Sequence, residues 1–268
     1  MPQCVCNGIQ IFFDDTGVSS GKPTVIFIHA HGLDGTMWDN FKIPYRESYR
    51  VVTYDLRGHG HSEKPATSYG RESEVTDLDD LIQFLGVQKV HLIGLSRGAS
   101  IALSFAALHP EKVNSVVAIG AGFDYLNNIP DFAEQLSETI SVLKTKGLYA
   151  AREHWSQLPI FSTLRNEGNE EALEIFEDTL LGYTGNHWLD PDPPKDSSLL
   201  ELVASIKSSA MVLVGENDLP GFVTCSEQLS EKIEGSIFKK IPNVGHLAPI
   251  ENSEVVNELI QNFLSESN

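Results

Sequence analysis

The pentapeptide Gly94-Leu95-Ser96-Arg97-Gly98 constrains the fold of this chain more than any other segment. Residues 89–93 before it form a short apolar run typical of a strand, and residues 99–109 after it have the composition of a helix that stops at Pro110. A serine on so tight a strand-to-helix turn has a strained backbone and crowded neighbours, which accounts for a glycine two residues away on each side. Such a turn holds the serine hydroxyl where it can react, whereas the pentapeptide without its flanks describes only a Gly-rich turn. Ser96 is therefore predicted to be a nucleophile.

Strand and helix patterns alternate along most of the chain. Strands are expected at residues 9–13, 24–28, 50–55, 89–95, 113–119, 210–214 and 236–241, and helices at 73–85, 99–109, 224–233 and 255–264. The continuous apolar runs indicate strands buried on both faces, and the alternation indicates a mainly parallel sheet covered by helices. Residues 124–206 show helical stretches without a buried strand. We therefore expect an α/β core domain at 1–123 and 207–268, with a helical cap, or lid, at 124–206.

Length, charge and hydropathy narrow the functional classes. The 268 residues suit one large domain or two small ones, and the net charge of −18 disfavours nucleic acid and anionic membranes as partners. No apolar run approaches the length of about 18 residues that a membrane span requires. The first six residues lack the basic and apolar blocks of a signal peptide. The expected location is therefore cytoplasmic.

The cysteine and histidine spacings do not favour a metal site. The three cysteines, Cys4, Cys6 and Cys225, are expected to be reduced and inert, with a metal or redox role for Cys4-x-Cys6 as the alternative. The pairs His29-x-His31 and His59-x-His61 are suggestive, but a metal needs convergent ligands and a supporting shell. Neither a metal nor another cofactor is predicted.

The partners of Ser96 follow two later strands. A serine hydroxyl needs a base, usually a histidine oriented by a carboxylate. His246 follows the strand at 236–241 and Asp218 follows the strand at 210–214, so both are expected at the sheet edge that carries Ser96. Asp124 is the main alternative to Asp218, and Glu216 and Glu251 are weaker rivals. The predicted catalytic residues are Ser96, Asp218 and His246.

Several segments together resemble the α/β-hydrolase fold superfamily, in its branch of small esterases, lactonases and cofactor-free haloperoxidases. They are an early His-Gly loop with a downstream Trp38, the segment Asp55-Leu56-Arg57-Gly58-His59-Gly60-His61-Ser62, the serine turn, Gly215-Glu216-Asn217-Asp218 and Gly245-His246. The resemblance covers nearly the whole core and implies a doubly wound, mainly parallel sheet with a cap inserted after the sixth strand. The segment after Asp124 matches only in position and helical character.

The sequence departs from the pattern of the resembled family at the oxyanion hole, the pair of donors that stabilises the negative oxygen of a tetrahedral intermediate. The backbone N–H of Arg97 is expected to be one donor. In the resembled family the loop after the first buried strand reads His-Gly-x, with x as the second donor. Here His29-Ala30 has the better spacing and makes His31 the donor, whereas His31-Gly32 has the expected letters and makes Leu33 the donor. We prefer His31. Arg57, His59 and His61 are expected to anchor loops.

The expected activity follows from these parts. The chain is predicted to be a cofactor-independent serine hydrolase that acts on a small-molecule ester or lactone. Its substrate pocket is expected to include Leu33, Phe123, Trp155 and Trp188, with packing of the cap on the core as the competing role for each. The resemblance also allows haloperoxidase (perhydrolase) or thioesterase activity, or a ligand-binding or signalling protein without catalysis. The substrate and the oligomeric state are not predicted.

Overall fold

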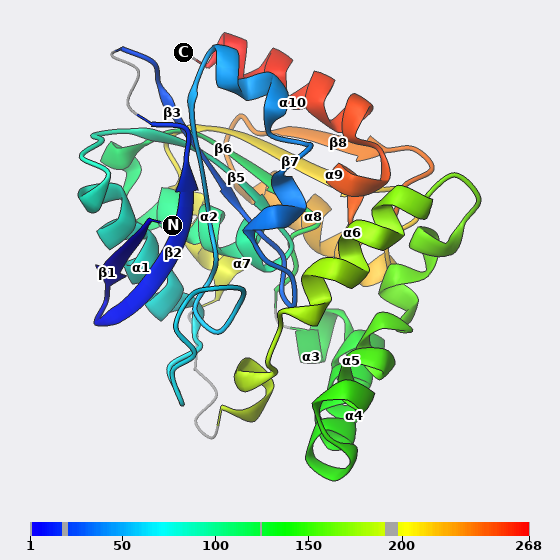
Figure 1. Ribbon diagram of the computed structural model, residues 1–268. Helices are drawn as coiled ribbons and strands as arrows, with labels where there is room; N and C mark the ends of the chain where they lie inside the picture. Colours follow the sequence, from blue (N-terminus) through cyan, green and yellow to red (C-terminus); the bar gives the residue numbers. More distant parts are fainter. Residues whose placement is uncertain (1, 18–20, 124, 191–197, 268) are drawn as a thin grey trace.

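The computed structural model describes residues 2–17, 21–123, 125–190 and 198–267, and one eight-stranded sheet forms its centre (Figure 1). The strands are β1 (Gln3–Cys6), β2 (Ile9–Asp15), β3 (Thr24–Ile28), β4 (Arg50–Tyr54), β5 (Val90–Leu95), β6 (Val113–Ile119), β7 (Ser209–Gly215) and β8 (Ile237–Ile241). Their order is β1-β2-β4-β3-β5-β6-β7-β8. The first two strands are antiparallel to their neighbours, and all pairings from β4 to β8 are parallel. The predicted mainly parallel sheet is confirmed.

The register of the central strands places their carboxyl ends beside one another. Ile28 of β3 pairs with Gly94 of β5, Leu95 of β5 pairs with Ile119 of β6, and Ile119 pairs with Leu213 of β7. The apolar runs of β3, β4 and β5 are buried throughout, as expected for strands covered on both faces. Loops that follow these strands therefore meet at one edge of the sheet.

Helices cover both faces of the sheet. In Figure 1, α1, α2, α7 and α8 lie on one face and α10 lies on the other. The helices are α1 (Arg71–Phe84), α2 (Arg97–Leu108), α3 (Tyr125–Asn128), α4 (Pro130–Lys146), α5 (Leu148–Ser156), α6 (Glu170–Leu181), α7 (Leu199–Leu202), α8 (Pro220–Lys232), α9 (Ala248–Glu251) and α10 (Ser253–Glu266). Short 3-10 helices lie at Gly35–Trp38, Ile43–Glu47, Pro110–Lys112, Pro159–Arg165, Asn186–Leu189 and Val203–Ser205. No helix among the described residues is long and apolar enough to cross a membrane.

The segment between β6 and β7 is helical, as the sequence predicts. Helices α4, α5 and α6 project from one end of the sheet (Figure 1), and we call residues 125–189 the cap. Helix α7 and the 3-10 helix at Val203–Ser205, both inside the predicted cap range of 124–206, pack instead against α2 and α8 of the core. Asp124 lies outside the described residues.

The strand β1 has no counterpart among the predicted elements. It is four residues long, and its buried residues are the two cysteines Cys4 and Cys6, so it lacks the β-branched or aromatic composition that usually marks a strand. Its pairing with β2 and its packing against α1 hold it in the sheet. Tertiary contacts, rather than local propensity, form this edge strand.

Candidate active site

Ser96 is the single residue that joins β5 to α2. Its backbone has φ 53° and ψ −110°, a conformation that L-residues rarely adopt. The backbone N–H of Ser96 donates to the carbonyl of Ile119 at 2.8 Å, which ties the turn to the neighbouring strand β6. This strained turn places Ser96 at the wall of a cavity, as expected for a serine that must meet a ligand.

Close packing explains the two glycines of the pentapeptide. A Cβ on Gly94 would lie 2.2 Å from the carbonyl oxygen of Gly98, and a Cβ on Gly98 would lie 2.2 Å from the carbonyl oxygen of Ile28. Neither distance is compatible with a side chain, and in both cases the opposing atom is backbone, which cannot rotate away. The glycines let α2 start directly on top of β5 and β3.

Asp218 and His246 form a buried pair at the same sheet edge. His246 Nδ1 donates to Asp218 Oδ2 at 2.8 Å, and the side chains are 3% and 0% exposed. The other carboxylate oxygen, Oδ1, accepts the N–H of Leu219 at 2.7 Å. These bonds fix the imidazole with its proton on Nδ1, so that Nε2 is the atom available to accept a proton.

Glu251, one of the weaker candidates for the triad carboxylate, holds the loop that carries His246 in place. Its Oε2 accepts the N–H of Gly245 at 2.7 Å, and its Oε1 accepts the N–H of Leu247 at 3.0 Å. The two residues that flank His246 are therefore held by one carboxylate. Sequence reasoning missed this role because the turn that brings Glu251 back to the loop is not visible in its spacing.

Two buried imidazoles shape the loop that follows β3. His29 Nδ1 donates to the carbonyl of Ala30 at 2.8 Å, and its Nε2 accepts the N–H of Leu56 at 2.8 Å. His59 Nδ1 donates to the carbonyl of Arg57 at 2.9 Å, and its Nε2 accepts the N–H of Gly32 at 3.1 Å. Burial lowers the pKa of both histidines, so both are neutral and each serves as one donor and one acceptor.

The same loop bears on the second oxyanion donor. The N–H of Gly32 is bonded to His59, and the N–H of Leu33 donates to the carbonyl of Ala30 at 3.3 Å. Within the described residues the backbone N–H of His31 makes no hydrogen bond. Of the two candidate donors, only His31 therefore has an uncommitted N–H.

The loop after β4 is anchored by ion pairs and backbone bonds. The Arg57 guanidinium donates to both carboxylate oxygens of Asp77 and to the carbonyl of Ser68. Asp55 accepts the N–H groups of Gly35 and His61 at 2.8 Å and 2.7 Å. Arg57, His59 and His61 thus hold loops together, as the sequence analysis expects.

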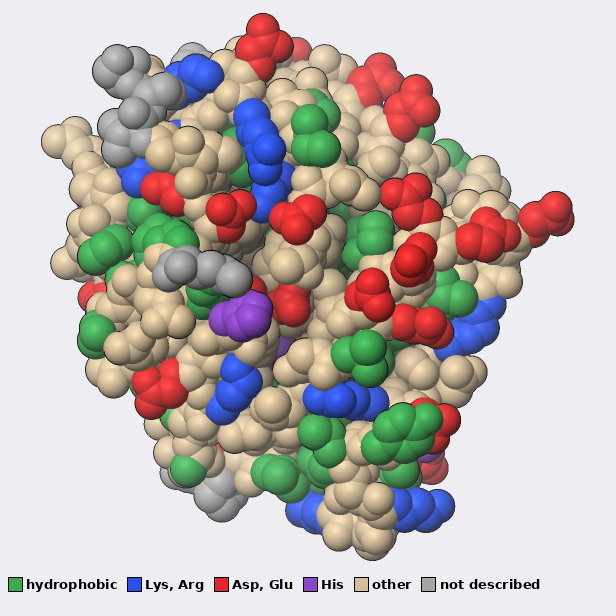
Figure 2. All heavy atoms as spheres, viewed as in Figure 1, with side chains coloured by type: hydrophobic (Ala, Val, Ile, Leu, Met, Phe, Trp, Pro, Cys, Tyr) green, Lys and Arg blue, Asp and Glu red, His purple; other side chains and the backbone are tan. Residues whose placement is uncertain are grey.

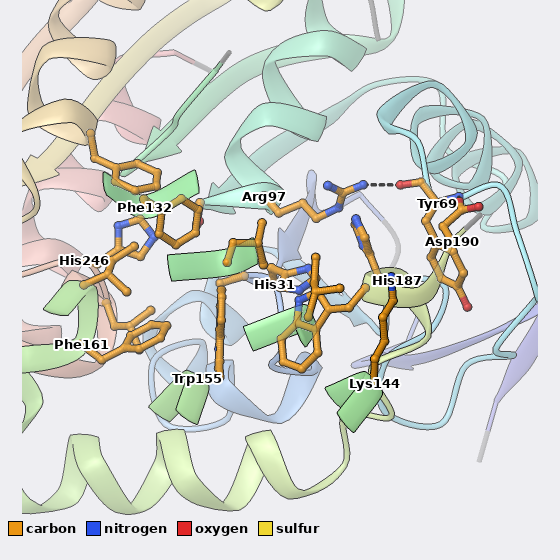
Figure 3. Close-up of a pocket in the computed structure, with 18 residues that line it drawn as sticks. His31, Tyr69, Arg97, Phe132, Lys144, Trp155, Phe161, His187, Asp190 and His246 are labelled. Atoms are coloured by element: carbon orange, nitrogen blue, oxygen red, sulfur yellow. Dashed lines mark hydrogen bonds between the residues drawn. The ribbon is translucent and has the colours of Figure 1, made fainter. Parts of the chain in front are cut away.

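A cavity of about 440 Å³ opens over Ser96 (Figure 3). Residues of the core loops and α8 form one wall, namely Ala30, His31, Tyr69, Ser96, Arg97, Phe222, His246 and Leu247. The cap and the residue after it form the other, namely Phe132, Leu136, Ile140, Lys144, Trp155, Ile160, Phe161, His187, Trp188 and Asp190. Ser96 and His246 therefore face one space, together with the predicted pocket residues Trp155 and Trp188.

The other two predicted pocket residues do not line this cavity. Leu33 is 2% exposed and packs into the core, because the turn from Ala30 to Leu33 directs it inward. Phe123 is 8% exposed, and its carbonyl accepts from Cys225 Sγ of α8 at 3.8 Å. The prediction for Leu33 and Phe123 was wrong because both side chains pack into the buried core rather than at the cavity.

An aromatic cluster surrounds His31 where the two walls meet. Its ring lies 5.5 Å from that of Trp155, 5.8 Å from Trp188 and 4.6 Å from His187 between centroids. Its Nε2 lies 3.2 Å from the hydroxyl of Tyr183. Burial and the nearby charge of Arg97 lower the pKa of His31 and of His187 well below the ordinary value, so both imidazoles are neutral.

Metal ligands are not assembled in the part of the chain that the structure describes. No group of three or more His, Cys, Asp or Glu side chains there is arranged to hold a metal ion. The nitrogens of His29 and His59 are already bonded to backbone groups. The polar groups at the cavity instead suit acyl-transfer chemistry, which needs a hydroxyl, a base and fixed N–H donors.

Comparison with known proteins agrees with this architecture. The chain matches the α/β-hydrolase fold family over residues 23–253. It is 26% identical over 269 aligned positions to 2-hydroxy-6-oxononadienedioate/2-hydroxy-6-oxononatrienedioate hydrolase 2 of Pseudomonas putida, covering 96% of this chain and 92% of that protein.

Two solved structures superpose over almost the whole chain. The enol-lactonase of Burkholderia xenovorans LB400 has a TM-score of 0.85 at 21% identity, covering 98% of this chain and 100% of that one. A thermophilic esterase from Thermogutta terrifontis, solved with malate bound, has a TM-score of 0.83 at 26% identity, covering 99% and 98%.

The order of the strands, the helical cap after β6 and the serine turn define an α/β hydrolase. The chain belongs to the α/β-hydrolase fold family, in which its neighbours include esterases and lactonases, and these relatives indicate a hydrolase.

Proposed function

We propose that this protein is a cofactor-independent serine hydrolase that cleaves a small carboxylic ester or lactone through an acyl-enzyme intermediate. The observation that carries the proposal is the meeting of Ser96 and His246 at one cavity, with His246 bonded to buried Asp218. Serine, aspartate and histidine occur in the chain order expected for this fold.

The proposed reaction assigns a role to each group. His246 Nε2 removes the proton of Ser96 as Oγ attacks the carbonyl carbon. The backbone N–H groups of His31 and Arg97 stabilise the oxyanion, and the uncommitted N–H of His31 supports its choice over Leu33. His246 then gives its proton to the leaving alcohol and activates a water that releases the acid. Asp218 keeps the imidazole in one tautomer throughout.

Other reactions known in this fold are alternatives to ester hydrolysis. The same nucleophile and base also suit thioester hydrolysis and perhydrolysis, and a member without turnover would bind its ligand without cleaving it. The names of the relatives add a lactone and a hydroxy-oxo dicarboxylate to the substrates worth testing. A panel of esters, lactones and thioesters, with a peroxide-dependent halogenation assay, separates these activities.

The first test is hydrolysis of p-nitrophenyl acetate by the wild type and by Ser96→Ala. The proposal predicts a loss of kcat of about a thousandfold or more in the variant, because no other hydroxyl replaces the nucleophile. Ser100→Ala is the matched control, since its hydroxyl is bonded within the fold to the carbonyl of Gly122 at 3.1 Å. Equal turnover by Ser96→Ala and the wild type would refute the assignment.

A further inference from the structure

The cavity has one end with apolar walls and one end with polar groups. In Figure 3, Phe132 and Phe161 lie near His246 at one end, whereas Tyr69, His187 and Asp190 lie together at the other. The Arg97 side chain extends from the serine turn toward Tyr69 and away from His246. The structure therefore favours a ligand with an apolar part near His246 and a polar group near Arg97.

The Arg97 guanidinium is fixed rather than mobile. Its Nε donates to Glu74 Oε1 at 2.8 Å, and its Nη2 donates to the carbonyl of Tyr69. Glu74 is fully buried, whereas the Arg97 side chain remains 19% exposed at the cavity wall. A guanidinium held in this way keeps its donors in one orientation, so little entropy is lost when a ligand adds another bond.

The fold does not require a charged side chain at this position. The residue after the nucleophile contributes to the proposed oxyanion hole through its backbone N–H, and that role is independent of the side chain. Replacing a buried ion pair by well-packed apolar residues of similar volume is often neutral or stabilising. The Arg97–Glu74 pair is therefore better explained by a ligand that it orients than by stability.

The charges around Arg97 define what this ligand can be. Buried Glu74 is the counter-ion of Arg97, and His31 and His187 are neutral. Among the described residues that line the cavity, the other charged side chains are Lys144 and Asp190, whose Oδ2 accepts the N–H of Tyr69 at 3.1 Å. Neutral imidazoles donate hydrogen bonds without adding charge. Arg97, paired with Glu74 but still partly exposed at the cavity, thus places a cationic side chain in the wall beside the nucleophile.

The exterior of the molecule has the opposite character. Acidic side chains line the outer surface of α6 (Figure 2), where Glu170, Glu171, Glu174, Glu177 and Asp178 are all exposed. A Debye length of about 8 Å at physiological salt screens these charges from the cavity. The acidic surface therefore does not prevent a negatively charged group from binding at Arg97.

We propose that Arg97 binds a carboxylate of the substrate, so that the preferred substrates are esters or lactones that carry a free carboxylate on a short chain. A carboxylate matches the planar guanidinium in shape and charge. Because Arg97 adjoins Ser96, this carboxylate lies a few bonds from the carbonyl that is attacked. The inference rests on the proposed function, which supplies the position of the reacting carbonyl.

A matched pair of substrates tests the proposal. Mono-4-nitrophenyl glutarate carries a carboxylate at the end of its acyl chain, and 4-nitrophenyl hexanoate has a chain of similar length without it. We expect the wild type to prefer the glutarate in kcat/KM. In Arg97→Met the ratio of the two kcat/KM values should fall by about 10- to 100-fold, and Arg97→Lys should give an intermediate ratio. Lys232→Met, at an exposed position of α8, removes the same charge elsewhere and should leave the ratio unchanged.

Two further measurements keep the outcome decisive. Circular dichroism establishes that Arg97→Met is folded, and a folded variant with the wild-type ratio would overturn the proposal. If neither ester is hydrolysed by the wild type, the proposed function fails, whereas calorimetric binding of glutarate still tests the subsite. Binding that is lost in Arg97→Met supports the carboxylate site, and binding that is unchanged refutes it.

Discussion

The two walls of the cavity differ in how their buried polar atoms are satisfied. On the core wall the Nδ1 of His246 is bonded to Asp218, and His59, which supports the neighbouring loop at Gly32, has both ring nitrogens bonded to the backbone. On the cap wall the indole Nε1 atoms of Trp155 and Trp188 and the Nδ1 of His187 are buried and make no hydrogen bond with any described residue. Ring packing, rather than directional bonds, holds the cap residues.

This difference separates chemistry from selectivity. A network of hydrogen bonds fixes atoms within tenths of an ångström, as a reacting centre requires. Aromatic packing tolerates exchange of one ring for another and sets the shape of the space instead. Substitutions of the triad and its supporting residues should therefore reduce turnover of all substrates, whereas substitutions in the cap wall, and of the Arg97 side chain, should change which substrates are accepted.

The largest expected effect on the core side comes from Asp218→Asn, which acts through His246 of the core wall. An amide leaves the His246 imidazole with the wrong tautomer, so kcat should fall by about 10⁴-fold for every ester tested. Glu216→Gln, an exposed neighbour on the same loop, is the control and should retain full activity. Steady-state kinetics with p-nitrophenyl acetate measures both. Near-normal turnover of Asp218→Asn would show that another carboxylate orients the base.

Gly98→Ala tests the packing beneath the nucleophile. The added Cβ would lie 2.2 Å from the backbone oxygen of Ile28, so we expect a loss of about 3 kcal/mol or more in the free energy of unfolding. Gly86→Ala is the comparison, because its Cβ meets nothing within 4 Å and only its φ of +67° adds strain. That variant should lose about 1 kcal/mol. Urea denaturation measures both, and equal losses would contradict the account.

The buried neutral imidazoles in and around the cavity predict a pH dependence of stability. Burial lowers the pKa of His59 in the folded state below that of the unfolded chain, near 6.5. Its contribution is complete above pH 6.5 and is lost as the pH falls toward the folded pKa, because the unfolded chain binds the proton first. His29, His31 and His187 act in the same direction.

His59→Gln isolates one of these contributions, since glutamine offers both a donor and an acceptor but does not titrate. As the pH falls below 6.5, the wild type should lose stability more steeply than the variant, by at most about 1.4 kcal/mol per pH unit. Urea unfolding at several pH values measures the difference. Parallel curves for the two proteins would show that His59 is not held neutral by the fold.

Trp155→Phe in the cap wall should have the smallest effect on turnover. The indole N–H has no partner to lose, so kcat for p-nitrophenyl acetate should change by less than about threefold. The enlarged cavity should raise kcat/KM for longer acyl chains by about two- to tenfold. An acyl-length series measures this shift, and a uniform loss across the series would place Trp155 with the chemical machinery instead.

The same division explains what the sequence alone predicts. Ser96 and Asp218 follow the buried strands β5 and β7, and His246 follows the more exposed edge strand β8. Parallel strands bring their carboxyl ends to one edge whatever the loops do. Leu33 and Phe123 also follow strands, but both side chains are buried in the core. The support of His246 by Glu251 and of Gly32 by His59 depends on how loops fold back, which has no periodic signal.

The sequence predicts only some features of the cap. Its helical character was visible in the sequence, and Trp155 and Trp188 were named as pocket residues. The sequence does not predict that α4 lines the cavity with Phe132, Leu136 and Ile140. An amphipathic helix has an apolar stripe, but the sequence does not show which surface that stripe covers. The packing of α7 on α2 similarly depends on contacts far apart in the chain.

The most direct test of the central claim is covalent labelling of Ser96. A fluorophosphonate reacts with a serine that is activated by a base, and mass spectrometry of the digested protein locates the adduct. The account predicts a single adduct on the peptide containing Ser96, abolished in Ser96→Ala and strongly slowed in His246→Gln. An adduct on another residue, or no adduct on the folded wild type, would contradict it.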